Sequence, residues 1–247
     1  MDFPTIPLTS HILSNPIVKK PIEFRAYTVG EESTMIQNKD MDIKEKLQGI
    51  RSVLKRCITS DHDIDKLPYV VIEHLFVAIR QYSAGEYIDA NYRCKVKNDQ
   101  DEDCGGVVPV QIDLSAVEFI TDPDIQTTIV LHEDPQNGDI GVKMRYPTIM
   151  TYIVAGDEGD FKNLICHCVE CIFQGDEVWT QPDDMSDAEW TEKVRGWWGT
   201  LTASTKMKVL QNFFGRLPNI QIKSVGVCKK CGHKHDFTYR KLTDFFI

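Results

Sequence analysis

The sequence predicts an α+β fold in which helical N- and C-terminal parts surround a central antiparallel β region that carries a pair of cysteine-bearing hairpins. Apolar residues recur at helical spacing before residue 85 and again after residue 160, and shorter segments that alternate apolar and polar residues lie between them. The chain has 247 residues, of which 42% are hydrophobic and 26% are charged, so it is long enough to bury a core. We expect an extended N-terminal arm over 1–20 and a single domain over 21–247, which divides into a helical part (30–85), a β-rich part (86–146), a second helical part (147–218) and a C-terminal hairpin (219–247).

The N-terminal third is predicted to contain the arm, one strand and three helices. Three prolines interrupt residues 1–20, which indicates an extended segment that needs a neighbour to become ordered. Alternation over 22–29 predicts a strand, and a short helix follows at 31–37. The next helix places its apolar residues in one stripe, at Ile43, Leu47, Ile50, Leu54 and Cys57. Pro68 is a favourable first residue for another helix, which Gly85 ends.

The middle of the chain is predicted to form two pairs of strands. Residues 86–97 are expected to pair with 107–113, and residues 125–131 with 140–144, across a segment rich in turn-forming residues. The acidic stretch 98–103 is expected to be a solvated loop tip between the first two strands.

Helical patterns return in the C-terminal third. One helix is expected over 161–172, and a capping box from Ser186 to Glu189 indicates the start of another. A further helix carries the apolar residues of 207–217 and stops at Pro218, after which two alternating segments predict the closing hairpin.

The strongest chemical motif is a pair of thiols in a tight turn, Cys228-Lys-Lys-Cys231, followed by glycine. This pattern is typical of half a zinc site, because the glycine lets backbone amides approach the sulfurs. Structural zinc takes four ligands, and the best second half is Cys94 with Cys104, which also lie between two strands and precede two glycines. Nine residues separate Cys94 from Cys104 instead of the usual two to four, so the excess must loop out. The sequence therefore predicts that Cys94, Cys104, Cys228 and Cys231 hold a structural Zn²⁺ ion in a zinc-ribbon-like pair of hairpins.

Two alternatives to this ligand set stay open. His233 or His235 replaces one of the cysteines, or the thiols bind no metal at all. A second thiol cluster, at Cys166, Cys168 and Cys171, spreads around a helix and is interpreted as core residues with one outlier, Cys166, although a loop there would permit a second metal.

Several functional classes lack their sequence signatures. The longest apolar run, Val70–Ile79, is broken by Glu73 and His74, so no membrane span is expected, and the first residues do not resemble a secretory signal. The chain contains no phosphate-binding glycine loop, no nucleophile elbow and no His-Glu-x-x-His motif, so we predict no catalytic residues and no enzyme.

Charge is distributed unevenly along the chain. Residues 1–192 hold 17 basic and 35 acidic side chains, a net charge of −18, whereas residues 193–247 hold 11 basic and 2 acidic, a net charge of +9. The basic end packs against the acidic part of the same chain or binds an acidic partner. A zinc-ribbon nucleic-acid-binding regulatory protein is the alternative function, but the acidic remainder would repel phosphates, so nucleic acid is not the expected partner.

The order of several short segments carries a resemblance that covers about residues 20–247. The segments are Phe24–Glu32, Ala78–Ser83, Tyr92–Cys94, Val110–Leu114, Arg145–Thr148, Gly175–Val178, Lys208–Phe214, Leu217-Pro218 and the closing Leu242–Phe246. In this order they resemble the T4-type bacteriophage baseplate protein family, which includes hub components and hub-assembly factors of contractile tails.

The resemblance implies a non-enzymatic structural or assembly role in the baseplate or hub of a phage tail. It implies other tail proteins as partners, a location in the virion, in the host cytoplasm during assembly, or in both, and no catalytic residues. Phe245 and Phe246, near the chain end, are candidates for filling a partner's pocket. The family pattern does not require the cysteine pairs, so the zinc prediction depends on their spacing alone.

Overall fold

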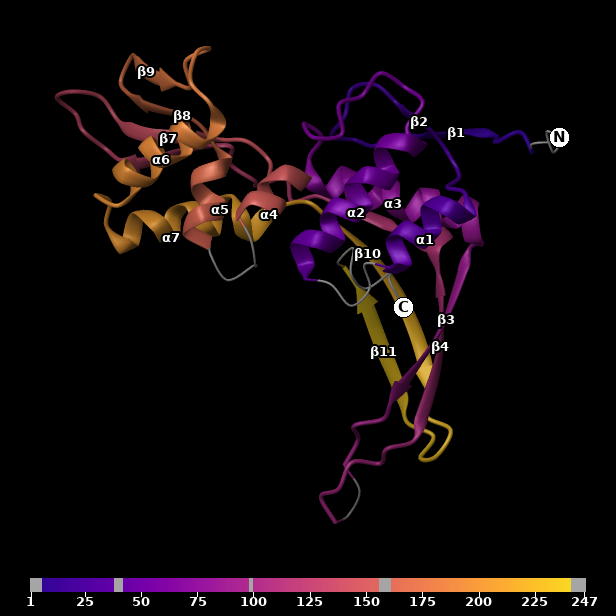
Figure 1. Ribbon diagram of the computed structural model, residues 1–247. Helices are drawn as coiled ribbons and strands as arrows, with labels where there is room; N and C mark the ends of the chain where they lie inside the picture. Colours follow the sequence, from indigo (N-terminus) through magenta and orange to yellow (C-terminus); the bar gives the residue numbers. More distant parts are fainter. Residues whose placement is uncertain (1–5, 38–41, 98–99, 156–160, 241–247) are drawn as a thin grey trace.

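The computed structural model describes residues 6–37, 42–97, 100–155 and 161–240, which form an α+β fold (Figure 1). The predicted interface residues Phe245 and Phe246 lie outside this part of the chain. The helices are α1 (Val29–Gln37), α2 (Ile43–Cys57), α3 (Tyr69–Ala84), α4 (Ile149–Ala155), α5 (Phe161–Cys168), α6 (Asp187–Trp198) and α7 (Ala203–Asn212), with 3-10 turns at Leu114–Ala116 and Phe214–Arg216. The strands are β1 (Ser10–Leu13), β2 (Ile22–Arg25), β3 (Tyr87–Arg93), β4 (Val107–Asp113), β5 (Glu118–Ile120), β6 (Thr128–His132), β7 (Ile140–Met144), β8 (Val169–Gln174), β9 (Glu177–Thr180), β10 (Asn219–Val227) and β11 (Lys234–Tyr239).

Local sequence signals set the ends of the main helices. Asp42 and Glu45 form a reciprocal capping box at the start of α2, and Ser186 and Glu189 form the predicted one at the start of α6. Pro68 directly precedes α3, as expected, because proline has no N–H to leave unsatisfied there.

The strands form four small antiparallel sheets. Their orders are β1-β2, β3-β4, β11-β10-β5 and β6-β7-β8-β9. The predicted pairs of the middle region are confirmed, since β3 pairs with β4 and β6 pairs with β7. The predicted C-terminal hairpin is β10 with β11.

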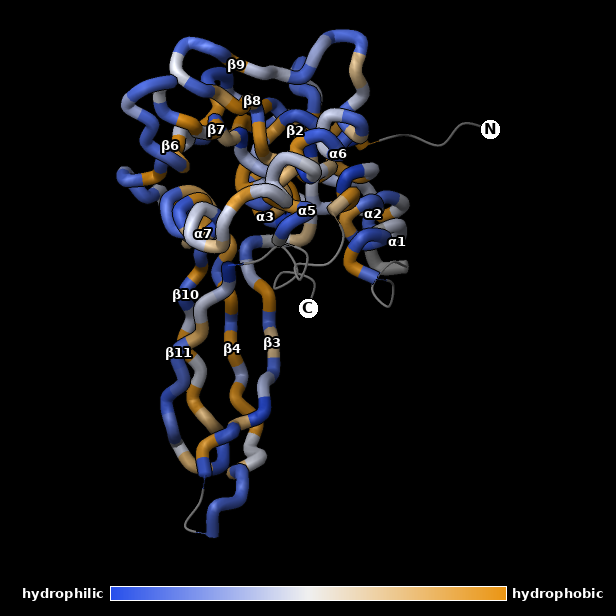
Figure 2. The backbone as a smooth tube through the Cα atoms, turned by 90° about the vertical axis from the view of Figure 1, so that its left-hand side faces the viewer, coloured by the Kyte–Doolittle hydropathy of each residue, from blue (hydrophilic) through white to orange (hydrophobic). Residues whose placement is uncertain are grey.

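Two hairpins lie side by side and extend away from the helices as an arm, which we define as β3, β4, β10, β11 and their connecting loops (Figures 1 and 2). Gly226 of β10 faces β4 so closely that an added Cβ would lie 2.6 Å from Val108 and 2.7 Å from Val110. Glycine is therefore needed where the two hairpins touch. The rings of Tyr92 and Phe237 stack across the hairpins with centroids 4.7 Å apart.

The buried residues form two hydrophobic cores. The first lies between α2, α3, β2 and the arm, and includes Leu54, Leu75 and Ile112. The second lies between the β6–β9 sheet and helices α5, α6 and α7, and includes Val142 and Phe213. All four tryptophans of the chain, at positions 179 to 198, lie in or beside this second core.

The structure differs from the prediction at several places, since strands β8 and β9 lie within the part predicted to be helical, 147–218, and two segments show the reason. The helix expected over 161–172 ends at Cys168, and the chain continues as β8. Val169 and Cys171 point into the protein and Glu170 points out, so the segment also fits a strand, and the free edge of β7 supplies its partner. Residues 1–20 are expected to form an extended N-terminal segment that needs a neighbour. Within them, residues 10–13 pair with β2, so the neighbour of this part belongs to the same chain.

Opposite charges from the two ends of the sequence meet in part within the fold. Arg216 lies 2.9 Å from Asp122, and Lys223 lies 3.7 Å from Glu118, so the basic C-terminal region does contact acidic residues of the same chain. Both pairs are at least a third exposed and add little stability.

A buried ion pair next to α2 gives the first testable prediction. Glu31 accepts two hydrogen bonds from Arg25, at 2.8 and 2.9 Å, and these bonds are the main cause that lowers its pKa from 4.5 to about 2. A lowered carboxyl pKa stabilises the fold above pH 4.5, and this stability is lost as the pH falls towards 2. We expect Glu31→Gln to reduce the free energy of unfolding at pH 7 by about 3 kcal/mol.

The pH dependence of urea unfolding checks this expectation. The difference between wild type and Glu31→Gln should shrink between pH 4.5 and pH 2, while the exposed control Glu23→Gln should behave as wild type. A difference that stays constant over this range would contradict the assignment.

Candidate metal centre

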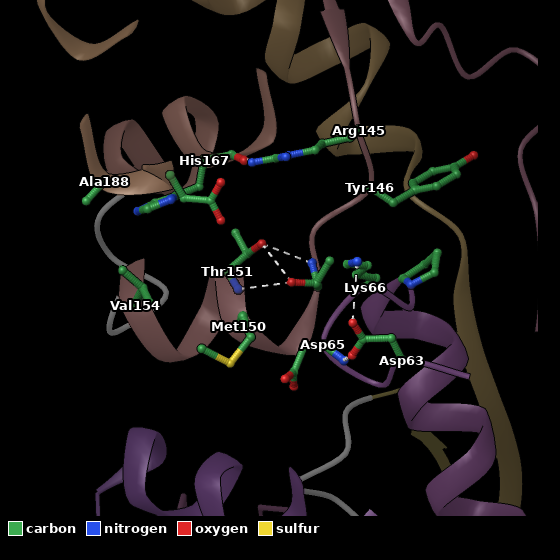
Figure 3. A pocket seen from close by; sticks show the side chains of 13 residues that line it. Asp63, Asp65, Lys66, Arg145, Tyr146, Met150, Thr151, Val154, His167 and Ala188 are labelled. Carbon is green, nitrogen blue, oxygen red and sulfur yellow. Dashed lines mark hydrogen bonds and ion pairs between the residues drawn. The ribbon is translucent and has the colours of Figure 1, made fainter. Parts of the chain in front are cut away.

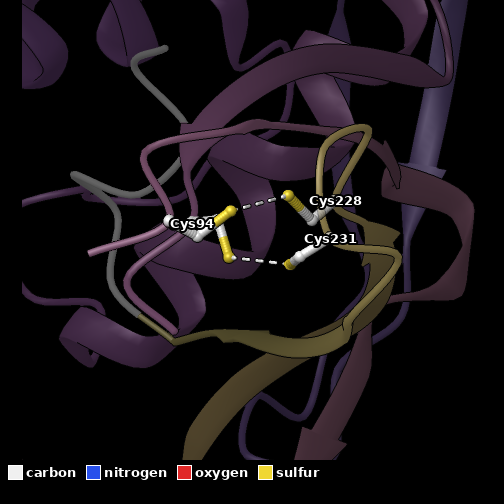
Figure 4. A group of neighbouring side chains, drawn as sticks. Cys94, Cys228 and Cys231 are labelled. Atoms are coloured by element: carbon white, nitrogen blue, oxygen red, sulfur yellow. Dashed lines mark hydrogen bonds between the residues drawn. The ribbon is translucent and has the colours of Figure 1, made fainter. Parts of the chain in front are cut away.

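Four cysteine side chains meet at the far end of the arm (Figure 4). Cys94 follows β3, Cys104 precedes β4, and Cys228 and Cys231 stand in the turn between β10 and β11. Their sulfur atoms all lie within 4.8 Å of one another. Cys94 is 3.7 Å from Cys231, and Cys104 is 3.8 Å from Cys228, so the two predicted halves of the site face each other.

Backbone hydrogen bonds shape both cysteine turns. In the β10–β11 turn, the amide of Cys228 donates to the carbonyl of His233 and the amide of Gly232 donates to the carbonyl of Cys228, both at 2.9 Å. Gly232 has a φ of +73°, which glycine adopts without strain. The amide of Lys230 also points at the sulfur of Cys228, at 3.4 Å.

The unusual spacing in the other hairpin is explained by an extension beyond the cysteines. The amide of Cys104 donates to the carbonyl of Val96 at 2.8 Å. Beyond this bond, the backbones of Lys97 and Asp103 pair in an isolated antiparallel β-bridge. The pairing of the two strand segments thus continues past Cys94 and Cys104. The extra residues extend the hairpin beyond the cysteines and do not separate the two sulfur atoms.

The donor set fits a tetrahedral thiolate-binding ion. Zinc with four thiolates has Zn–S bonds of about 2.3 Å, which places neighbouring sulfurs about 3.8 Å apart. The separations of 3.7 and 3.8 Å agree with this geometry. Gly106 closes one side of the group, because a Cβ there would lie only 2.6 Å from the sulfur of Cys228.

Hydrogen bonds and burial act in opposite directions on the thiols. Backbone amides of Cys231 and Lys230 lower the pKa of the Cys228 thiol to about 6, since they favour the thiolate. Burial raises the pKa of the Cys94 thiol to about 12. The Cys228 sulfur is thus favoured as a thiolate. A bound cation would stabilise the negative charge of the buried Cys94 thiolate as well, and so promote its ionisation.

The histidines near the site do not join the group of four. His235 Nε2 lies 3.3 Å from the sulfur of Cys94, at hydrogen-bond distance. This is the position of a residue that contacts a ligand without being one itself. The ring of His233 packs edge-on against His235, with centroids 4.8 Å apart. The motif did not signal the contribution of Lys230, whose ammonium donates to the carbonyl of Cys104 at 2.7 Å and joins the two turns.

The other cysteines lie elsewhere and are buried. Cys166, Cys168 and Cys171 all belong to or border the second core, and burial raises the pKa of Cys168 to about 12. Over residues 6–37, 42–97, 100–155 and 161–240, the arm cysteines are the one group of three or more potential ligands whose donor atoms converge. The interpretation of Cys168 and Cys171 as core residues agrees with their burial, whereas Cys166, the expected outlier, is buried as well.

A cavity of about 670 Å³ lies beside α4, at the junction of the two cores (Figure 3). Several of its polar side chains have partners: Thr148 and Thr151 cap α4 reciprocally, and Arg145 Nε donates to the carbonyl of His167 at 3.1 Å. Burial is the main cause that lowers the pKa of His167, whose Nδ1 lies 3.2 Å from the hydroxyl of Thr191.

Fold and site together define the class of this protein: an α+β protein with a projecting arm that ends in four thiols able to bind a metal ion. The chain belongs to the T4 bacteriophage base plate protein family, whose model matches residues 9–247. The resemblance noted in the sequence is thereby confirmed over nearly the whole chain. No curated protein and no solved structure matches the chain.

Membership in this family makes the chain a structural component of a phage baseplate, located in the tail of the virion, with other tail proteins as partners. Within the described ranges, no helix combines the length and the apolar character that crossing a bilayer requires.

Proposed function

We propose that this baseplate protein has a non-enzymatic structural or assembly role at the baseplate or hub of a contractile tail, and that it acts through protein–protein contacts. It would be made and assembled in the host cytoplasm before it enters the particle. The observation that supports this proposal most directly is the arm, because a four-stranded projection that extends away from the helices offers surface to neighbouring proteins (Figure 2). The family match places the chain in the baseplate.

We also propose that Cys94, Cys104, Cys228 and Cys231 are the ligands of a structural Zn²⁺ ion. Three of these four cysteines are buried, although the arm is only two small hairpins thick. The cysteines lie towards the end of the arm, away from the helices (Figure 1), where a metal is a strong source of additional stability. The ion would fix the relative position of the two hairpins, and four protein ligands would leave it no open coordination position.

Reconstitution of tails tests the functional proposal. Extracts of cells infected with a phage that lacks this gene should regain tail assembly when the purified wild-type chain is added, and the chain should then co-sediment with tail intermediates. Binding of the purified chain to DNA at low salt, without co-sedimentation, would instead favour the nucleic-acid-binding alternative.

Chelation of the metal should change the arm and leave the second core unaffected. The arm contains Tyr92, Phe237 and Tyr239, whereas all tryptophans lie in or beside the second core. Removing zinc with a chelator is therefore expected to change the tyrosine bands of the near-ultraviolet circular dichroism spectrum and to leave the tryptophan emission maximum unchanged. A shift of the tryptophan emission on chelation, reversed by added zinc, would contradict the proposed location of the ion.

A further inference from the structure

Strand β9 forms an exposed edge of the β6–β9 sheet. It pairs with β8 on one side, and among the described residues no strand pairs with its other side. All four of its residues are exposed, including Val178 at 58% and Trp179 at 46%. Edge strands are usually protected by short length, charge, proline or a covering segment; β9 is short and carries Glu177, but it has no lysine or proline. Its backbone is therefore available to pair with an added strand.

A groove of about 360 Å³ runs beside this edge, between the sheet and α6. Trp179 lines it from β9, Ile172 from β8, and Trp190 and Trp197 from α6. The indole of Trp190 is held by a hydrogen bond of 3.3 Å to the carbonyl of Val169, so this part of the groove is fixed before anything binds. Tryptophans in such positions are the commonest anchors of protein interfaces.

The segment around the groove is strongly acidic. Residues 176–192 contain seven acidic side chains and no basic one, and all seven are exposed. In the part of the chain that the structure describes, Glu192 is the member of this set that forms an ion pair, with Arg195. Lys193 follows the segment and lines the groove. The remaining negative charges are available to a positively charged partner.

We propose that this edge binds a basic, extended segment of another tail protein, which adds as a strand beside β9. Alternate side chains of a strand point to opposite sides, so apolar residues of the segment would enter the tryptophan groove. Its lysines or arginines would face the acidic residues and contact the indole rings. This inference rests on the proposed function, because it assigns one of the protein–protein contacts of the baseplate.

Photo-crosslinking in assembled tails tests the proposal. The photoreactive amino acid p-benzoylphenylalanine is placed at Lys193, on the groove, and as a control at Val130, an exposed position on β6 at the opposite edge of the sheet. We expect position 193 to crosslink to one segment of a tail protein, and mass spectrometry should show a net positive segment. The control should not label that segment. A crosslink to a net negative segment, to a second copy of this chain or to nothing in assembled tails would overturn the proposal.

A pair of matched variants separates the groove from general effects. Trp179 and Met207 are 46% and 47% exposed, so truncating either is expected to leave the fold intact. Trp179→Ala should reduce the crosslink yield at position 193 at least about 10-fold, whereas Met207→Ala should leave it unchanged. An unchanged yield with Trp179→Ala would refute the groove as the binding site. Failure of the proposed function would appear differently, as absence of the wild-type chain from tail intermediates.

Discussion

Replacing Cys228 with serine is expected to remove zinc from the purified protein, from about one ion per chain to less than about 0.1. Cys228 provides the sulfur that two backbone amides favour as a thiolate, and it lies 3.8 Å from Cys104. A serine hydroxyl is a poor zinc ligand, and three thiolates would leave the site open to water. Inductively coupled plasma mass spectrometry of the dialysed protein measures this effect directly.

The matched control for this variant is Cys171→Ser. Cys171 is 8% exposed, lies on β8 and is far in the fold from the arm, so its replacement should leave the zinc content unchanged. Loss of zinc in Cys171→Ser, with retention in Cys228→Ser, would contradict the proposed site and support a metal at the second thiol cluster.

Loss of the ion should also open the arm to proteolysis. Lys229, Lys230 and Lys234 lie in and beside the turn that holds Cys228 and Cys231, and trypsin cleaves after lysine. We expect Cys228→Ser to be cut there rapidly while the rest of the chain persists, because without the ion the already exposed turn can unfold locally and enter the protease while both cores stay folded. Equal rates of cleavage for wild type and variant would show that the arm does not depend on metal.

Replacing Gly106 with alanine is expected to weaken zinc binding by about 10- to 100-fold, although no ligand is changed. The added methyl group would lie 2.6 Å from the sulfur of Cys228 and 2.6 Å from Cβ of Lys230, so the two hairpins would have to move apart. Competition with a chromophoric chelator measures the change in affinity.

Gly196→Ala provides the comparison for this variant. Gly196 lies in α6, where an added Cβ meets nothing within 4 Å. This change should stabilise the helix by about 1 kcal/mol and leave zinc affinity unchanged. Equal zinc affinities for the two alanine variants would show that the close approach at Gly106 does not shape the site.

The proposed ligands could be selected from the sequence because their motif is local. Two cysteines separated by two residues and followed by glycine define a turn without reference to the rest of the chain, and Cys94 and Cys104 could be added because strands flank them too. The capping box at Ser186, the helix after Pro68 and the hairpins were predictable for the same reason, since each depends on a few neighbouring residues. The order of short segments likewise sufficed to indicate the baseplate family.

The tertiary structure decided which distant segments meet. Cys94 and Cys231 are separated by 137 positions, and contacts between the two hairpins, among them the close approach of β10 to β4 at Gly226, place their sulfurs 3.7 Å apart. The segment 169–172 fits a helix or a strand by its own pattern, and it becomes β8 because β7 offers an edge to pair with. That choice also creates the exposed edge of β9 and its tryptophan groove. Local pattern fixes turns and helix ends, whereas strand pairing depends on which partner the whole chain brings close, and the sequence of a single segment does not contain that information.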